Sequence, residues 1–191
     1  GFITPIFMIL NGVSVGLGSG ATSSISRFVG AKNHKKASQS AAHSLLIFLI
    51  ASVVLTIVLL ILQEPLLKLY GASGESLAQG IKYGTPLFLG LFAFIFANGA
   101  SGILRGEGDM KRAMYAVVVS VILNAILDPI CIYILGWGSA GAAIATILSS
   151  ICSAIVILYW ILVKKDTYVD VNLGEFKFDS SIAKDILKVG I

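Results

Sequence analysis

The stretch NAILDPI, residues 124–130, places an amide, a carboxylate and a proline inside an apolar run. Of the ten acidic residues, only Asp128 lies deep within such a run. A charged side chain at the bilayer centre costs at least ~2.5 kcal/mol, so such residues usually bind a cation, take up a proton or pair inside a helix bundle. Asn124 precedes Asp128 by four residues, so on a helix the two side chains share a face. The pair therefore predicts a cation- or proton-binding site within the membrane.

Pro129 follows the carboxylate directly. It lacks a backbone N–H and frees a carbonyl one turn back, near Ala125, so we expect a helix kink at Pro129. A carboxylate, an amide oxygen and a loosened carbonyl are the ligands that a hard cation such as Na⁺ prefers. We therefore expect Na⁺ or H⁺ as the ion at this site, with no other cofactor and no catalytic residues.

The whole composition indicates that lipid surrounds these residues. Apolar residues make up 57% of the chain and charged residues only 13%, whereas soluble domains carry about a quarter charged residues. Runs long enough to span a bilayer must be helical, because the backbone has to satisfy its own hydrogen bonds in lipid. We expect an all-α, polytopic integral membrane protein with spans at about 2–26, 41–62, 83–104, 113–135 and 140–163.

The lysines and arginines predict the orientation of these spans. The successive connections and the tail hold 4, 2, 3, 0 and 5 of them, an alternation that follows the positive-inside rule. The first and third connections and the tail should therefore be cytoplasmic. The basic residues lack the interleaved aromatics of a nucleic-acid surface, so no nucleic-acid partner is expected.

Span five should supply a second polar partner for Asp128. The connection between spans four and five is very short, so the two spans must pack antiparallel. Thr146 lies about six residues into span five, at nearly the depth of Asp128. Its hydroxyl could join Asn124 and Asp128, or it could bond the backbone of its own helix, as membrane threonines often do.

Small residues recur in the first span. Gly12, Gly16 and Gly20 are four apart and share one helix face, where they would allow close helix packing in lipid. A phosphate-binding loop is the weaker alternative, because such a loop should follow a strand. Residues Gly138, Gly141 and Ala145 could act similarly at the start of the fifth span.

The two most basic connections resemble each other. RFVGAKNHKKA begins at Arg27, and RGEGDMKRA begins at Arg105; each has a glycine three residues on and a basic pair before an alanine. This hints at a duplicated helix pair, a common feature of transporters, although topogenic charge alone could produce it.

Both ends of the chain predict a longer protein. The first span must enter from outside without a preceding span, and DSSIAKDILKVGI reads as an N-cap at Asp179 or Ser180 followed by an amphipathic helix. We expect residues 1–163 to be a partial amino-terminal transmembrane lobe. Residues 164–191 would form a cytoplasmic loop and the start of the next helix.

Taken together, GLGSGATSSISRFVGAKNHKKA, GILRGEGDMKRAM and NAILDPICIYILGWGSAGAAIAT resemble the multidrug and toxic compound extrusion (MATE) family, prokaryotic type. The resemblance implies family helices two to six, most of one six-helix lobe of a twelve-helix transporter. It implies a multi-pass antiporter of the cell (inner) membrane that exports organic, often cationic compounds in exchange for Na⁺ or H⁺. Asn124 and Asp128 match the family's cation site in helix five, and Thr146 matches it in helix six. The first helix and the carboxy-terminal lobe would complete the site and the substrate cavity.

Two other classes of protein stay open. A lipid-linked saccharide flippase of the related superfamily would share the lobe, but we expect its cavity to be richer in basic residues than these spans. An intramembrane aspartyl protease needs two carboxylates that share a site, and this chain offers one.

Overall fold

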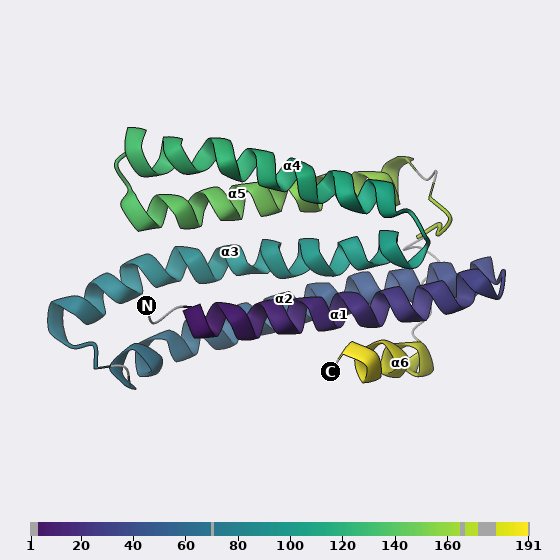
Figure 1. Ribbon diagram of the computed structural model, residues 1–191. Helices are drawn as coiled ribbons and strands as arrows, with labels where there is room; N and C mark the ends of the chain where they lie inside the picture. Colours follow the sequence, from purple (N-terminus) through teal and green to yellow (C-terminus); the bar gives the residue numbers. More distant parts are fainter. Residues whose placement is uncertain (1–3, 70, 165–166, 172–178, 191) are drawn as a thin grey trace.

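Figure 1 shows a computed structural model of the chain, which describes residues 4–69, 71–164, 167–171 and 179–190. Every regular element among these residues is helical, which confirms the all-α prediction. The long helices are α1 (Thr4–Gly30), α2 (His34–Leu69), α3 (Gly74–Gly106), α4 (Met110–Pro129) and α5 (Gly138–Leu158). The wider π-helical segments η1 (Ile130–Ile134) and η2 (Tyr159–Lys164) extend α4 and α5, and a short α6 (Ser180–Gly190) comes last.

Four helical stretches are long and apolar enough to cross a membrane: His34–Leu69, Gly74–Gly106, Met110–Ile134 and Ala140–Lys164. They coincide with the second to fifth predicted spans, and most run past the predicted ends. The first predicted span forms α1, a helix of 27 residues, and its crossing of the membrane stays a prediction. Residues 2–3 of that span, and 165–166, 172–178 and 191 of the predicted cytoplasmic segment, lie outside the described residues.

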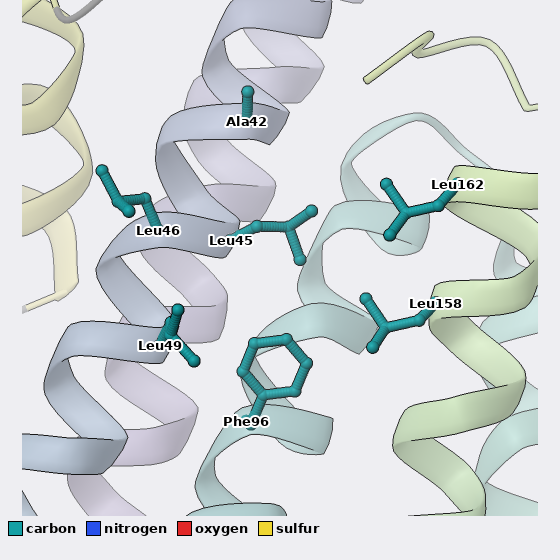
Figure 2. Close-up of a pocket in the computed structure, with 7 residues that line it drawn as sticks. All are labelled: Ala42, Leu45, Leu46, Leu49, Phe96, Leu158 and Leu162. Atoms are coloured by element: carbon teal, nitrogen blue, oxygen red, sulfur yellow. The ribbon is translucent and has the colours of Figure 1, made fainter. Parts of the chain in front are cut away.

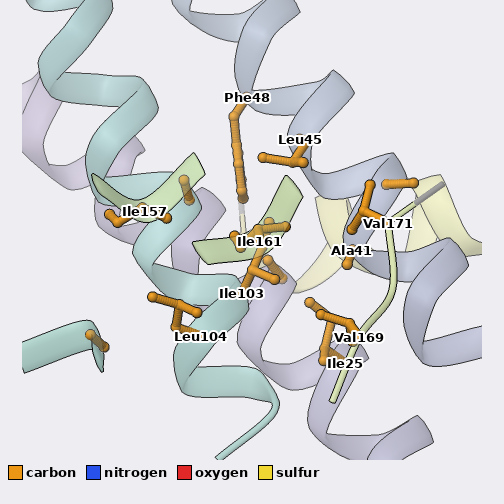
Figure 3. Packing of buried hydrophobic residues seen from close by; sticks show 14 of the residues in the cluster. Ile25, Ala41, Leu45, Phe48, Ile103, Leu104, Ile157, Ile161, Val169 and Val171 are labelled. Carbon is orange, nitrogen blue, oxygen red and sulfur yellow. The ribbon is translucent and has the colours of Figure 1, made fainter. Parts of the chain in front are cut away.

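Helix α3 lies at the centre of the bundle, between the α1–α2 pair and the α4–α5 pair (Figure 1). The main apolar cluster joins all of these helices near the end that carries the basic loops. Figure 3 shows its largest side chains, which are fully buried: Ile25, Phe48, Ile103, Ile157 and Ile161. The short segment 167–171, which follows η2, closes this cluster with Val169 and Val171.

Helices α1 and α3 cross at glycines. A Cβ on Gly102 would lie 2.4 Å from the carbonyl oxygen of Gly18, so the two backbones are in direct contact. The Thr22 hydroxyl joins the crossing through contacts of 2.8 Å to Gly102 O and 2.9 Å to Gly18 O. Gly18 therefore makes the close approach that the sequence assigned to another series of glycines.

In that series, Gly20 is buried and Gly16 is half-buried, but Gly12 is exposed. A Cβ on Gly12 would meet nothing within 4 Å among the described residues. The packing role of Gly12 therefore stays a prediction. At the start of α5, Gly141 does pack closely, since a Cβ there would lie 2.5 Å from Cys131 O.

The two basic loops have the same backbone structure. In the first, Asn33 N donates to Phe28 O at 2.9 Å, and in the second, Asp109 N donates to Leu104 O at 2.9 Å. The residue before each of these has a positive φ, 53° at Lys32 and 92° at Gly108. The structure therefore supports a repeated helix pair, α1–α2 and α3–α4.

The backbone structure pairs Asn33 with Asp109, whereas the sequence motifs pair Arg27 with Arg105, so the two alignments of the loops differ in register. Asn33 and Asp109 both cap the next helix, with side chains accepting from Lys36 N at 3.1 Å and Arg112 N at 3.0 Å. The basic pair and the alanine after it are therefore equivalent in the two loops. The arginines that open the two sequence motifs are not, because the first loop has two more residues between its arginine and its cap.

Helix α6 lies beside α1 at the basic end of the bundle (Figure 1). Ile182 and Ile186 are buried against the bundle, whereas Leu187 and Val189 are exposed. An ion pair of 2.5 Å joins Asp185 to Arg27 of α1. The amphipathic helix is thus present, and one side of it is docked.

Candidate cation site

Three contacts fix the antiparallel register of α4 and α5. Gly141 packs on Cys131, Thr146 bonds Asn124, and the Ser153 hydroxyl donates to Ala116 O at 3.1 Å. Asp128 lies between the first two contacts, so it is level with Ala142 and Ala143 of α5. Thr146 is therefore level with Asn124 and about one turn from Asp128, on the side toward the basic loops.

The Thr146 hydroxyl makes two hydrogen bonds, one within its own helix and one to Asn124. Its hydroxyl donates to Ala142 O in its own helix at 3.0 Å. The same oxygen accepts from the Asn124 Nδ2 group at 3.3 Å. The Asn124 amide nitrogen donates in this hydrogen bond, and the amide oxygen Oδ1 is the atom that can bind a cation. The structure brings these two residues together across the α4–α5 interface.

Asp128 carries an unusual oxygen. Its Oδ1 is buried and has no hydrogen-bond partner among the described residues. Such an atom is costly in a low-dielectric interior, because it loses its water and gains nothing in return. The residue as a whole is half-buried, which leaves a route for a partner to reach it. A cation, a proton or a donor from a further segment would remove the cost.

The helix changes its hydrogen-bonding pattern directly after Pro129. The following five residues form the π-helical segment η1, which ends with Leu135 N donating to Ile130 O at 2.9 Å. Trp137 N then donates to Cys131 O at 3.2 Å. Local π-helical turns are frequent at functional sites and at bends. A wider turn thus begins at Ile130, two residues beyond Asp128.

The donor set suits a hard monovalent cation. One carboxylate, one amide oxygen and one hydroxyl oxygen come from the two antiparallel helices, and all three prefer hard cations. No group of three His, Cys, Asp or Glu residues that could hold a metal ion occurs in the described part of the chain. A transition-metal centre has no support from these residues, whereas an oxygen-ligated Na⁺ or a proton fits them.

A second carboxylate that sequence reasoning missed is Glu107, in the loop between α3 and α4. Its Oε2 accepts from Val169 N at 3.1 Å, and its Oε1 is buried without a hydrogen-bond partner among the described residues. Burial raises the pKa of Glu107 from 4.5 to about 7, and nearby Asp109 adds to this. Only the folding back of segment 167–171 creates this environment.

A purely apolar groove runs beside α3, on the side between α2 and α5. One pocket of it, about 280 Å³, is lined by Ala42 and leucines of α2, by one leucine each of α5 and η2, and by Phe96 (Figure 2). A neighbouring pocket of about 570 Å³ continues it past Phe92. No polar side chain lines either pocket, so neither could hold a desolvated ion.

Comparison with known proteins agrees with this arrangement. The family model described as MatE matches residues 1–130. The multidrug export protein MepA of Staphylococcus aureus is 30% identical over 98% of this chain, and the chain spans 41% of that protein.

Solved structures match the fold closely. A multidrug resistance MATE family transporter of the MOP superfamily in its inward-facing conformation is 45% identical, with a TM-score of 0.91 over 99% of this chain and 43% of that one. An outward-facing structure of such a transporter is also 45% identical, with a TM-score of 0.92 over 98% of this chain and 42% of that one. The chain is a membrane protein that belongs to the MATE family of multidrug efflux transporters.

Proposed function

We propose that this chain forms most of one lobe of a secondary antiporter in the cell (inner) membrane. The antiporter exports organic, often cationic compounds in exchange for Na⁺ or H⁺. The observation that carries this proposal is the buried, unpartnered Oδ1 of Asp128, one turn from the Asn124–Thr146 pair. A carboxylate held in this state gains more from a cation than one already satisfied by hydrogen bonds.

The coupling step follows from charge. An ion bound to Asp128 neutralises the carboxylate, with Asn124 Oδ1 and the Thr146 hydroxyl as neutral ligands. The packing of η1, directly beyond Pro129, then responds to the loss of charge. A ligand shifts such an element only by its different affinity for the two states. The close fit of the lobe to both inward- and outward-facing structures supports a local change within a lobe that keeps its overall shape.

The lining of the cavities supports an organic or cationic cargo. No lysine or arginine among the described residues lines the apolar groove or the serine-lined cavity between α3, α4 and α5. A flippase that carries a pyrophosphate-linked sugar would need positive charge to balance the phosphates. The absence of lysine and arginine from these linings therefore favours the antiporter over the flippase.

The decisive experiment is Asp128→Asn in the full-length transporter. The change keeps the side-chain volume and removes the charge that distinguishes the bound from the unbound state. Export driven by an imposed Na⁺ or pH gradient should fall tenfold or more, while insertion is kept or improved. Efflux and surface expression are measured in the same cells. Normal gradient-driven export by a well-expressed variant would make Asp128 a structural acid.

Smaller losses are expected at the neutral ligands. Asn124→Ala and Thr146→Ala each remove one oxygen, so export should fall by less than in Asp128→Asn. A matched control is Thr22→Ala, which removes a membrane threonine at the α1–α3 crossing. The control should lower the free energy of unfolding by about 1 kcal/mol and leave export per folded molecule unchanged.

A further inference from the structure

A second polar region lies deeper in the bundle, between α3, α4 and α5. It is a cavity of about 180 Å³ whose lining includes five polar side chains: Asn98, Ser101, Ser120, Ser150 and Ser153. One buried water needs only ~10–15 Å³ of such volume together with two to four polar partners. The cavity therefore has the size and the polarity to hold several waters or a partly hydrated ion.

The hydrogen bonds of the lining determine what it can bind. The hydroxyls of Ser101, Ser150 and Ser153 donate to the backbone carbonyls of Asn98 at 2.9 Å, Thr146 at 2.8 Å and Ala116 at 3.1 Å. The Asn98 Nδ2 group donates to Phe94 O at 2.9 Å. Since these donors are committed to the backbone, the side chains offer oxygen lone pairs to a guest. A cavity of acceptors favours a cation or a water that donates.

The cavity adjoins the cation site on both helices. Ser120 is one turn before Asn124 on α4, and Ser150 is one turn after Thr146 on α5. The Ser150 hydroxyl bonds the Thr146 carbonyl directly, as does that of Ser149 at 3.0 Å. The polar groups thus continue from the site toward the end of the bundle that carries the basic loops.

One turn beyond the cavity, toward that end, lie the fully buried apolar side chains of Leu104 on α3 and Ile157 on α5. Ser153 bonds Ala116 at the lower side of the cavity, and below it α4 turns Ala113 and Ala116, both buried, toward its neighbours. Ala116 is six residues from the start of α4 at Met110, or roughly 9 Å along the helix axis. The cavity is therefore closed toward the basic end in this structure, and a shift of Leu104 and Ile157 would open it.

We propose that this serine-lined cavity is the hydrated passage by which the coupling cation moves between the Asp128 site and the cytoplasm. The ion leaves its carboxylate, exchanges Asn124 and Thr146 for the oxygens of Ser120 and Ser150, and reaches bulk water past Ser153. This proposal rests on the antiport function and adds the direction of ion exit and the residues that line it.

Silver-ion accessibility tests the passage. Ag⁺ is a small monovalent cation that reacts with ionised thiols, which form in water and not in lipid. In the full-length transporter with Cys131 and Cys152 replaced by alanine, we introduce Ser120→Cys on α4 and Ser153→Cys on α5. The matched control is Val118→Cys, at the same depth on an exposed face of α4. Ag⁺ in nitrate buffer is added to the cytoplasmic side of inside-out vesicles.

We expect both cavity cysteines to react at least tenfold faster than Val118→Cys, with Ag⁺ from the cytoplasmic side. Reaction no faster than the control, at both positions in folded protein, overturns the passage. Reaction only from the outer side overturns its direction and hence the proposal. The use of two helices keeps the test decisive where one variant fails to fold.

A parallel measurement separates the passage from the antiport function. Substrate export by the parent protein, driven by an imposed Na⁺ or pH gradient, should be lost in Asp128→Asn. If neither gradient drives export, the antiport proposal fails, and the cation passage fails with it. If either gradient drives export while the cavity cysteines stay unreactive, the passage alone is wrong.

Discussion

The two repeated helix pairs share a scaffold and differ in what it carries. Phe48 and Ser52 lie as far after the cap Asn33 in the first pair as Asn124 and Asp128 lie after the cap Asp109 in the second. Phe48 is fully buried, and a Cβ on Gly99 of α3 would come within 2.7 Å of its ring. Ser52 is also fully buried, and its hydroxyl donates to Leu49 O at 2.9 Å.

The equivalent positions in the second pair are less completely satisfied. Asn124 and Asp128 are half-buried, and one Asp128 oxygen has no hydrogen-bond partner among the described residues. A position that is closed and satisfied contributes stability, whereas a position that is open and unsatisfied is available to a ligand. The same helix position can therefore serve packing in one repeat and ion binding in the other.

The largest effect should come from moving the carboxylate into the first pair. Ser52→Asp places a charge where the wild-type side chain is fully buried. The position equivalent to Asn124 is occupied by Phe48 in this pair, so no amide is available beside the new carboxylate. The cost should be at least ~2.5–3.5 kcal/mol, so folded protein in the membrane should fall by tenfold or more. The amount of folded protein is measured by fluorescence-detected size-exclusion chromatography of detergent extracts.

The reciprocal variant, Asp128→Ser, is the matched control. It gives the second pair the side chain of the first, so the yield of folded protein should be equal to or above wild type while gradient-driven export is lost. Equal yields for Ser52→Asp and wild type would mean that the first pair tolerates a carboxylate at this depth. The position in the first pair would then be as open to a carboxylate as the position in the second.

A smaller effect is expected in the loops, where the repeats differ at the residue with positive φ. Gly108→Ala places a Cβ at a φ of 92° and should cost about 1–2 kcal/mol. Lys32→Gly removes a side chain from a φ of 53° and should stabilise by up to ~1 kcal/mol. Thermal unfolding of the purified transporter compares the two. Shifts of the same sign would show that the loops are not equivalent.

The sequence predicted the spans well because lipid simplifies the problem. A membrane helix needs only length and low polarity, and the apolar runs supply both. The sequence does not predict how each helix is rotated about its axis, since a helix that is apolar on all sides has no polar face to reveal its inner side. For this reason the close contact of α1 falls at Gly18 and not at Gly12.

The polar residues of the site could be foreseen in part. The spacing of Asn124 and Asp128 and the short connection after η1 were enough to predict that Thr146 would lie near them, and the hydrogen bond to Asn124 agrees. The serine-lined cavity needed the positions of three helices. Glu107 needed the return of segment 167–171, which carries no periodic pattern. Long-range folding of this kind is not encoded in local spacing.

The smallest predicted effect concerns Glu107, whose equivalent in the first loop is Ala31. In the folded protein burial raises the pKa of Glu107 from 4.5 to about 7, so folding favours the protonated form. The stabilising contribution of the neutral carboxyl is complete below pH 4.5 and is lost as the pH rises through about 7. The contact between the α3–α4 loop and segment 167–171 should therefore loosen over this range, although each half of the bundle stays folded.

Hydrogen exchange at the Val169 amide, which donates to Glu107, reports this contact directly. Corrected for intrinsic exchange rates, its protection should fall severalfold between pH 5 and pH 8 in wild type and stay nearly constant in Glu107→Gln, because glutamine keeps an acceptor and cannot ionise. Both proteins carry His34→Gln, which removes another side-chain contact to the same segment, the His34 ring stacked on Tyr168 at 3.7 Å. An equal pH dependence in the two proteins would leave Glu107 with no more influence on its loop than Ala31 has.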